Sequence, residues 1–113
     1  MRSAGLAGQI TYLLNSPVLT RYGSWTFSGP LAHWEAQGLA RNALSAVGHR
    51  ATAEFIACIL KVPVAWSRRT VHLRPGDRAL VFCLLRRQIE GDVLDFQRLA
   101  REPHEFALLE RTA

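Results

Sequence analysis

The chain has 113 residues, of which 49% are hydrophobic and 20% charged, a balance typical of one globular domain rather than of a disordered chain. Its 14 basic residues outnumber 9 acidic ones, which gives a formal net charge of +5, and every basic residue except Lys61 is arginine. Arginine binds phosphate with a planar fork, but a GC-rich genome also enriches arginine, so composition alone leaves phosphate binding and background open. No apolar run approaches the roughly 18 residues that cross a bilayer, which excludes a membrane-spanning helix.

The two cysteines and the N-terminal segment indicate a cytoplasmic protein. Cys58 and Cys83 each lie inside an apolar run, so we expect two buried thiols and no disulfide. Residues 1–9 lack the long apolar stretch of a secretory signal. We therefore expect one cytoplasmic domain over residues 1–113, with residues 1–8 as a candidate for disorder and no membrane partner.

The first third of the chain predicts two strands and a helix. Residues 9–14 are apolar, β-branched and aromatic, which indicates a strand, and the strand ends at residues 15–17 (NSP) because proline breaks regular pairing. The aromatic segment 18–27 predicts a turn that leads into a second strand. A helix is then expected with Pro30 in its first position and with Trp34 on its apolar stripe.

The clearest predicted helix covers residues 51–61. Its apolar side chains repeat with the spacing of one buried face: Phe55, Ile56, Ile59 and Leu60. Pro63 follows and marks the end of this helix, because proline is excluded from helix interiors.

The second half predicts the centre of the sheet. Residues 69–73 and 78–85 flank the turn-forming residues 74–77 (RPGD), so we expect the two runs to pair as a hairpin. Residues 79–85 are apolar throughout, which indicates a central strand that is buried on both faces. Three elements follow: a polar loop at residues 86–92, a short helix at 95–101 and a last strand at 105–111. Because strands and helices alternate, the predicted fold class is α/β, with a single mixed β-sheet flanked by helices.

One histidine lies where an anion could bind. His49 follows Gly48 directly before the predicted helix, and the unpaired amides and dipole at a helix start favour a negative group. A histidine titrates near neutral pH and can protonate a leaving oxygen. A polar loop histidine without a role would have the same sequence, so this alternative stays open.

Other catalytic motifs are absent from the sequence. His33, His72 and His104 have no metal-ligand spacing, and the chain carries no CxxC, HExxH, GxSxG, Walker A or GxGxxG pattern. We therefore expect neither a metal nor another cofactor.

Three groups of arginines remain as candidate anion-binding positions: Arg68 with Arg69, Arg74 with Arg78, and Arg86 with Arg87. The first and third groups lie at predicted strand ends, where binding sites form most often. Arg87 opens a loop that also contains Glu90 and Gly91. Such a loop either folds over a phosphate ligand or forms a solvated turn, and the sequence leaves both open.

Taken together, five segments resemble one family. They are residues 12–20 (YLLNSPVLT), 45–53 (SAVGHRATA), 76–82 (GDRALVF), 90–91 (EG) and 108–113 (LLERTA). In this order they resemble the viral type III anti-CRISPR ring nucleases and their CRISPR-associated cellular relatives. The segment that ends in glycine and histidine before the helix is the most specific part.

This resemblance implies a substrate, an assembly and a reaction. The family degrades cyclic tetra-adenylate, the second messenger of type III CRISPR defence, and binds it across the two-fold axis of a homodimer. An isologous interface suits such a ligand because it offers two equivalent half-sites. The reaction uses no metal: a ribose 2′-hydroxyl attacks the neighbouring phosphorus and leaves a 2′,3′-cyclic phosphate.

The resemblance also assigns roles to individual residues. His49 matches the catalytic histidine, a general acid, and Arg87 and Glu90 match the arginine and glutamate of the loop that closes on the ring. The expected substrate-binding residues are Asn15, Ser16, Gly48, Thr52, Arg68 and Arg87. Three positions depart from the family pattern: Cys83, Ser67 and the segment 65–66 (AW).

Two other functions stay open. The charge of +5 permits a non-catalytic basic nucleic-acid-binding module, although aromatic residues do not alternate with arginine as a stacking surface requires. The other open function is a dimeric interaction module, in which His49 only marks the start of a helix. If the resemblance holds, only Arg68 and Arg87 of the thirteen arginines are expected to bind the ligand. So small a set favours a compact four-phosphate ring over stable binding to duplex nucleic acid.

Overall fold

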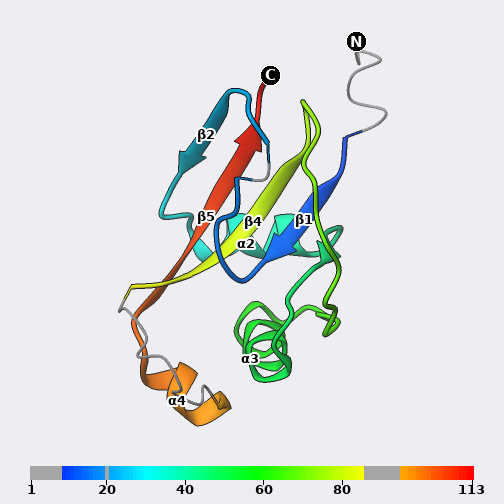
Figure 1. The fold of residues 1–113 in the computed structure, drawn as a ribbon. Coiled ribbons are helices and arrows are strands. Elements are labelled where there is room, and N and C mark those ends of the chain that lie inside the picture. Colours follow the sequence, from blue (N-terminus) through cyan, green and yellow to red (C-terminus); the bar gives the residue numbers. More distant parts are fainter. Residues whose placement is uncertain (1–8, 20, 86–94) are drawn as a thin grey trace.

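The computed structural model describes residues 9–19, 21–85 and 95–113, which form a sheet with helices packed on it (Figure 1). The strands are β1 (Thr11–Leu14), β2 (Trp25–Ser28), β3 (Leu44–Ser45), β4 (Arg78–Leu84) and β5 (His104–Arg111). The helices are α2 (His33–Ala40), α3 (Arg50–Leu60) and α4 (Phe96–Arg101). Residues 1–8 and the loop that contains Arg87 and Glu90 lie outside the described residues, so the expectations for them stay predictions.

The sheet is mixed, as the sequence predicts. Its strand order is β2-β5-β4-β1-β3, with β1 parallel to both β3 and β4 and with β5 antiparallel to both β4 and β2. The apolar strand β4 is central, which confirms its prediction as a strand buried on both faces. Because β1, β3 and β4 run in the same direction, their carboxyl ends point toward the same edge of the sheet.

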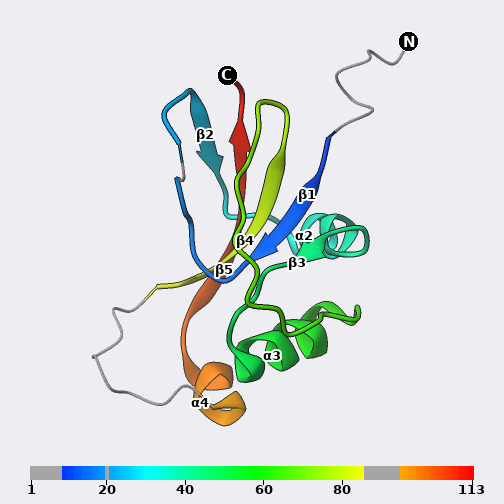
Figure 2. The same cartoon turned by 45° about the vertical axis from the view of Figure 1, so that its right-hand side comes forward.

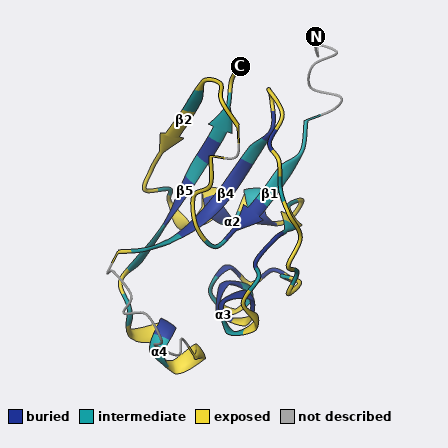
Figure 3. Ribbon diagram, viewed as in Figure 1, coloured by how far each residue is buried: buried dark blue, intermediate teal, exposed yellow. Residues whose placement is uncertain are grey.

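The helices cover only one face of this sheet (Figures 1 and 2). The core on that face joins Leu13, Phe82 and Phe106 of the sheet to buried residues of α2, α3 and α4. The core on the other face consists of Leu14, Ala46, Leu73, Ala79, Val81 and Leu109. Among the described residues no helix contributes to that second core, and the irregular segment before β4 lies across part of this face (Figure 3). We call this second side the helix-free face.

The predicted hairpin does not form. Residues 69–73 are irregular, and Val71 and Leu73 pack onto the helix-free face instead of pairing with β4. The physical reason is that both edges of β4 are already hydrogen-bonded, one to β1 and the other to β5. The turn at residues 74–77 is real, but it leads from an irregular segment into β4.

Two further expectations are corrected on the helices. Helix α2 begins at His33 rather than at Pro30, because the Leu31 N–H donates to the Phe106 carbonyl at 2.8 Å and holds this stretch against β5. Trp34 is 74% exposed, since the small Ala36 and Ala40 face the sheet instead.

Helix α3 confirms the predicted helix, and its apolar stripe is its buried face. Cys58 lies on the opposite side and is exposed, so the prediction of two buried thiols is wrong for this residue. Cys83 is half-buried, and both cysteines are free, as expected.

A buried carboxylate fixes the start of the sheet. Asp77 is 2% exposed, and its two oxygens accept hydrogen bonds from the Ile10 N–H at 3.1 Å and the Arg74 N–H at 2.9 Å. Its own carbonyl accepts from the Arg111 N–H at 3.1 Å. Asp77 therefore joins the beginning of β1, the turn before β4 and the end of β5.

We expect Asp77→Ala to lower the free energy of unfolding by about 2 kcal/mol, because it leaves two N–H groups without their acceptor. Urea denaturation followed by circular dichroism measures this loss. Asp95 is a matched control: its carboxylate caps exposed helix α4 by accepting from the Arg98 N–H at 2.8 Å. Asp95→Ala should cost about 1 kcal/mol. An equal or smaller loss for Asp77→Ala would contradict the role assigned to it.

Candidate functional site

The topology brings two predicted segments to one edge of the sheet. Asn15 and Ser16 follow β1, while Gly48 and His49 follow its parallel neighbour β3. The Ala46 N–H donates to the Leu13 carbonyl at 2.8 Å, which keeps the chain after β3 beside the end of β1. The family resemblance assigns these residues to one ligand site, and the parallel pairing of β1 with β3 accounts for their common edge.

His49 is the N-cap residue of α3. Its backbone is extended (φ −117°, ψ 124°), and its carbonyl accepts the Ala53 N–H at 3.0 Å, the first hydrogen bond of the helix. Its side chain makes no capping bond and is exposed, so the imidazole is available at the helix start. The N–H groups of the first helical turn, which have no partner within a helix, favour an anion at this end. The His49 imidazole and the end of α3 that favours an anion therefore lie together.

A second segment is fastened to the chain before His49. Val47 forms a parallel bridge with Trp66, and the Ser67 N–H donates to the Val47 carbonyl at 3.0 Å. The Gly48 carbonyl accepts from two side chains, Trp66 Nε1 at 3.1 Å and Arg68 Nε at 3.2 Å. Arg68 therefore lies next to the helix start, as the phosphate-binding prediction requires. Among the described residues no partner holds its terminal nitrogens, which leaves them available to a phosphate.

Asn15 and Ser16 line a hollow of about 120 Å³ at the same edge. Its other lining residues are Leu14, Val18, Ala46, Arg69, Val71 and Leu73. Several of these belong to the core of the helix-free face, so the hollow opens on that side of the sheet. A pocket for a small organic ligand has about 300–1,000 Å³, so this hollow, as the described residues form it, is smaller than such a pocket.

Thr52 is placed differently from the other predicted contacts. It is 4% exposed and lies beneath the first turn of α3, where its side chain belongs to the buried part of the helix. The structure thus brings together Asn15, Ser16, Gly48, His49 and Arg68 at the surface. Arg87 and Glu90 follow β4 in the sequence and lie outside the described residues.

Trp66 and Arg50 are neighbours of the site that the sequence reasoning did not assign. The Arg50 guanidinium lies 5.7 Å from the centre of the Trp66 ring, within the range of a cation–π contact, and it also pairs with Glu54 at 3.3 Å. The indole is 53% exposed. The sequence signal that could have identified Trp66 is a large aromatic residue directly before the polar residues Ser67, Arg68 and Arg69.

Cys83 lies on the helix-free face opposite Glu105 of β5. Burial, and to a lesser extent the Glu105 carboxylate, raises the pKa of the Cys83 thiol above its ordinary value. The reactive form of cysteine is the thiolate, so at neutral pH this side chain is a weak nucleophile. It is therefore a poor candidate for covalent catalysis.

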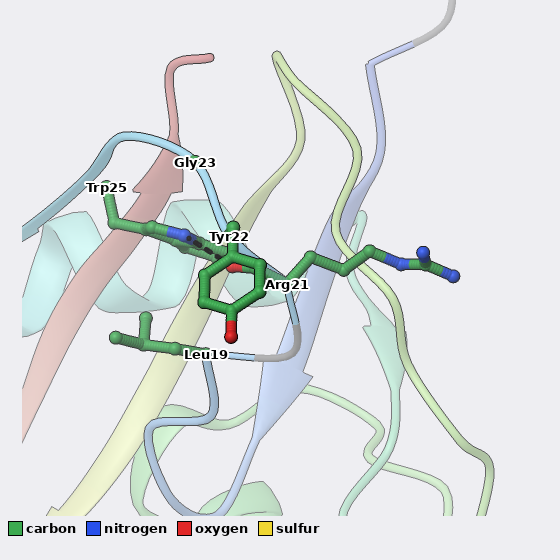
Figure 4. Close-up of a pocket in the computed structure, with 5 residues that line it drawn as sticks. All are labelled: Leu19, Arg21, Tyr22, Gly23 and Trp25. Atoms are coloured by element: carbon green, nitrogen blue, oxygen red, sulfur yellow. Dashed lines mark hydrogen bonds between the residues drawn. The ribbon is translucent and has the colours of Figure 1, made fainter.

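A larger hollow, of about 660 Å³, lies beside β2 (Figure 4). It is lined by Leu19, Arg21, Tyr22, Gly23 and Trp25, and the Trp25 Nε1–H donates to the Arg21 carbonyl at 3.2 Å. None of the predicted site residues lines it. Its walls are mostly apolar and aromatic, which suits packing more than acid–base chemistry.

Neither a metal site nor a membrane-spanning helix is found in the described part of the chain. Within residues 9–19, 21–85 and 95–113, no three His, Cys, Asp or Glu side chains gather as a metal site requires. Over the same part of the chain, no helix has the length and apolar character needed to cross a membrane.

Comparison with known proteins gives the family. The family model described as STIV B116-like matches residues 11–106. Among solved structures, B116 of Sulfolobus turreted icosahedral virus has the same fold, with a TM-score of 0.68 at 17% sequence identity, over 90% of this chain and 99% of that one. No curated protein sequence matches. The family model covers most of the chain and the fold agrees, so this chain belongs to the STIV B116-like family, which the motifs in its sequence indicated.

Proposed function

We propose that this chain is a metal-independent ring nuclease, which binds cyclic tetra-adenylate between two copies of itself and cleaves it to linear products, thereby ending type III CRISPR signalling. The observation that carries the proposal is the exposed imidazole of His49 at the start of α3, with the Arg68 guanidinium held on the adjacent Gly48 carbonyl. Membership of the STIV B116-like family and the motif resemblance in the sequence support the same substrate.

The cleavage step needs few groups from the protein because the nucleophile belongs to the substrate. A ribose 2′-hydroxyl gives its proton to water and forms a bond to the adjacent phosphorus, while the bond between phosphorus and the 5′-oxygen breaks. His49 donates a proton to that leaving oxygen, and the products are a 2′,3′-cyclic phosphate and a free 5′-hydroxyl. Arg68 and the first N–H groups of α3 stabilise the negative charge that develops on the phosphate.

The loop residues complete this assignment. By the family resemblance Arg87 stabilises charge on the scissile phosphate, and Glu90 orients His49 or the ribose. Both residues follow β4, which runs parallel to β1 and therefore toward the edge where Asn15 and His49 lie.

The helix-free face supports the proposed homodimer. Its exposed large apolar side chains include Val18, Phe27 and Leu85, which line two hollows on that side. The hollow beside Asn15 opens on the same side, so two copies paired through this face would bring two partial sites together. A two-fold arrangement gives a four-phosphate ring two equivalent half-sites.

Binding without cleavage is the alternative. A basic module of this kind would bind single or duplex nucleic acid with strong salt dependence and would leave cyclic tetra-adenylate intact. Among the described residues, the arginines beside His49 are Arg50 and Arg68, and so small a group favours a compact ligand over a long polyanion.

We expect His49→Ala to slow cleavage of cyclic tetra-adenylate by about 100-fold or more, because it removes the general acid. The assay is run in EDTA, and linear products are followed by chromatography. His33→Ala is the matched control, since His33 is also exposed at the start of a helix but on α2. No cleavage by the wild type, or equal cleavage by His49→Ala, would overturn the proposed function.

We expect Phe27→Asp to convert the dimer to a monomer, because it places a charge on an apolar interface. Light scattering after size-exclusion chromatography measures the mass, and the same sample should lose most of its cleavage activity. Trp34→Asp is the control: Trp34 is 74% exposed against 53% for Phe27, but it projects from α2 rather than from the helix-free face. A wild type that is monomeric, or a Phe27→Asp variant that stays dimeric, would contradict this interface.

A further inference from the structure

The carbonyl groups of three successive residues before α3 are all hydrogen-bonded. The Val47 carbonyl accepts from the Ser67 N–H at 3.0 Å, and the His49 carbonyl accepts from the Ala53 N–H at 3.0 Å. Between them, the Gly48 carbonyl has two side-chain donors, Trp66 Nε1 at 3.1 Å and Arg68 Nε at 3.2 Å. A carbonyl oxygen has two lone pairs, so the Gly48 oxygen is fully used.

These hydrogen bonds fix the orientation of the peptide group that leads into His49. The Gly48 carbonyl belongs to the peptide plane that extends to the His49 Cα, and holding its oxygen holds that plane. Glycine itself does not impose this geometry: a Cβ added at Gly48 would make only an ordinary contact, with Arg68 Cγ at 3.5 Å. The side chains of Trp66 and Arg68 therefore supply a restraint on the backbone that the local sequence lacks.

The same bonds affect the charge beside the helix start. An unpaired carbonyl oxygen next to a bound phosphate would repel it, whereas an oxygen that accepts two hydrogen bonds has its partial charge compensated. Leaving this acceptor without donors would therefore weaken the site for an anion and loosen the peptide before His49.

The two donors are not equivalent. Arg68 is exposed and cationic, and under the proposed function it turns toward a substrate phosphate, which competes with its bond to Gly48. Trp66 is a neutral donor: its backbone is held by the bridge to Val47, and its ring lies against the Arg50 guanidinium, 5.7 Å from the ring centre. Trp66 can thus keep the Gly48 oxygen paired after Arg68 has left it.

We propose that Trp66 is a positioning residue for His49, which acts through the Gly48 carbonyl and allows Arg68 to turn to the substrate without unpairing that oxygen. This role rests on the proposed ring-nuclease function. It gives a physical purpose to a tryptophan at one of the positions where the sequence departs from the family pattern.

The test is Trp66→Phe, which removes the N–H donor and keeps an aromatic ring. We expect kcat for cleavage of cyclic tetra-adenylate to fall about fivefold, the factor that one net hydrogen bond supplies, with KM changed less than twofold. In an Arg68→Ala background the same substitution should again cost about fivefold in kcat, because Arg68 has already left the Gly48 carbonyl in the substrate complex of the wild type. Trp34→Phe, at the exposed tryptophan of α2, should leave both parameters unchanged.

Thermal unfolding separates positioning from a merely structural role. Trp66→Phe should unfold within about 2 °C of the wild type, since this exposed indole contributes little to the core. A wild-type rate for Trp66→Phe overturns the role of Trp66, and so does a lower unfolding temperature with kcat and KM both altered. In either case, cleavage by the wild type still supports the proposed nuclease. Absence of cleavage by the wild type overturns the nuclease and this role together.

Discussion

Strand β1 is paired in parallel on both sides, and the geometry of the candidate site depends on this pairing. Its register with β3 places Leu13 opposite Ser45, and its register with β4 places Leu14 opposite Val81. A shift of one residue would turn Leu13 away from the helices and Leu14 away from the helix-free core, so burial on both faces fixes the register. With the register fixed, the chain leaves β1 at Asn15 and leaves β3 toward His49 along the same edge.

The candidate site then depends on carbonyl groups as much as on the His49 side chain. A helix start attracts an anion because its N–H groups are unpaired, but the chain that leads into the helix also presents oxygens that repel one. Here the carbonyl oxygens of Val47, Gly48 and His49 all accept hydrogen bonds. The donors to the first two of these oxygens come from the segment around Trp66 and Arg68. Pairing these acceptors leaves the N–H donors of the helix start and the Arg68 guanidinium as the groups beside the imidazole that attract an anion.

The sequence predicted those elements that local chemistry determines. Helix α3 follows from its apolar stripe, β4 from its unbroken apolar run, and the short helix α4 from a region that begins with the capping residue Asp95. Which segments pair in the sheet depends on distant partners, and the sequence alone did not determine it. Residues 69–73 have the composition of a strand, yet β1 and β5 already occupy both edges of β4. At the site, the position of His49 before a helix was visible in the sequence, whereas nothing in one sequence pairs the Trp66 indole with a carbonyl 18 residues earlier.

The one-sided packing of the helices links the fold to the assembly. α2, α3 and α4 cover one face of the sheet, and the other face keeps Val18 exposed at a hollow of about 120 Å³ and keeps Phe27 and Leu85 exposed at another of about 290 Å³. If a second copy covers that face, the same contact buries the apolar side chains and doubles the set of Asn15, His49 and Arg68. The net charge of +5 then matters less than its distribution, because two small groups of arginines across a two-fold axis match four phosphates in a ring. Folding and ligand binding would in this way depend on the same uncovered face.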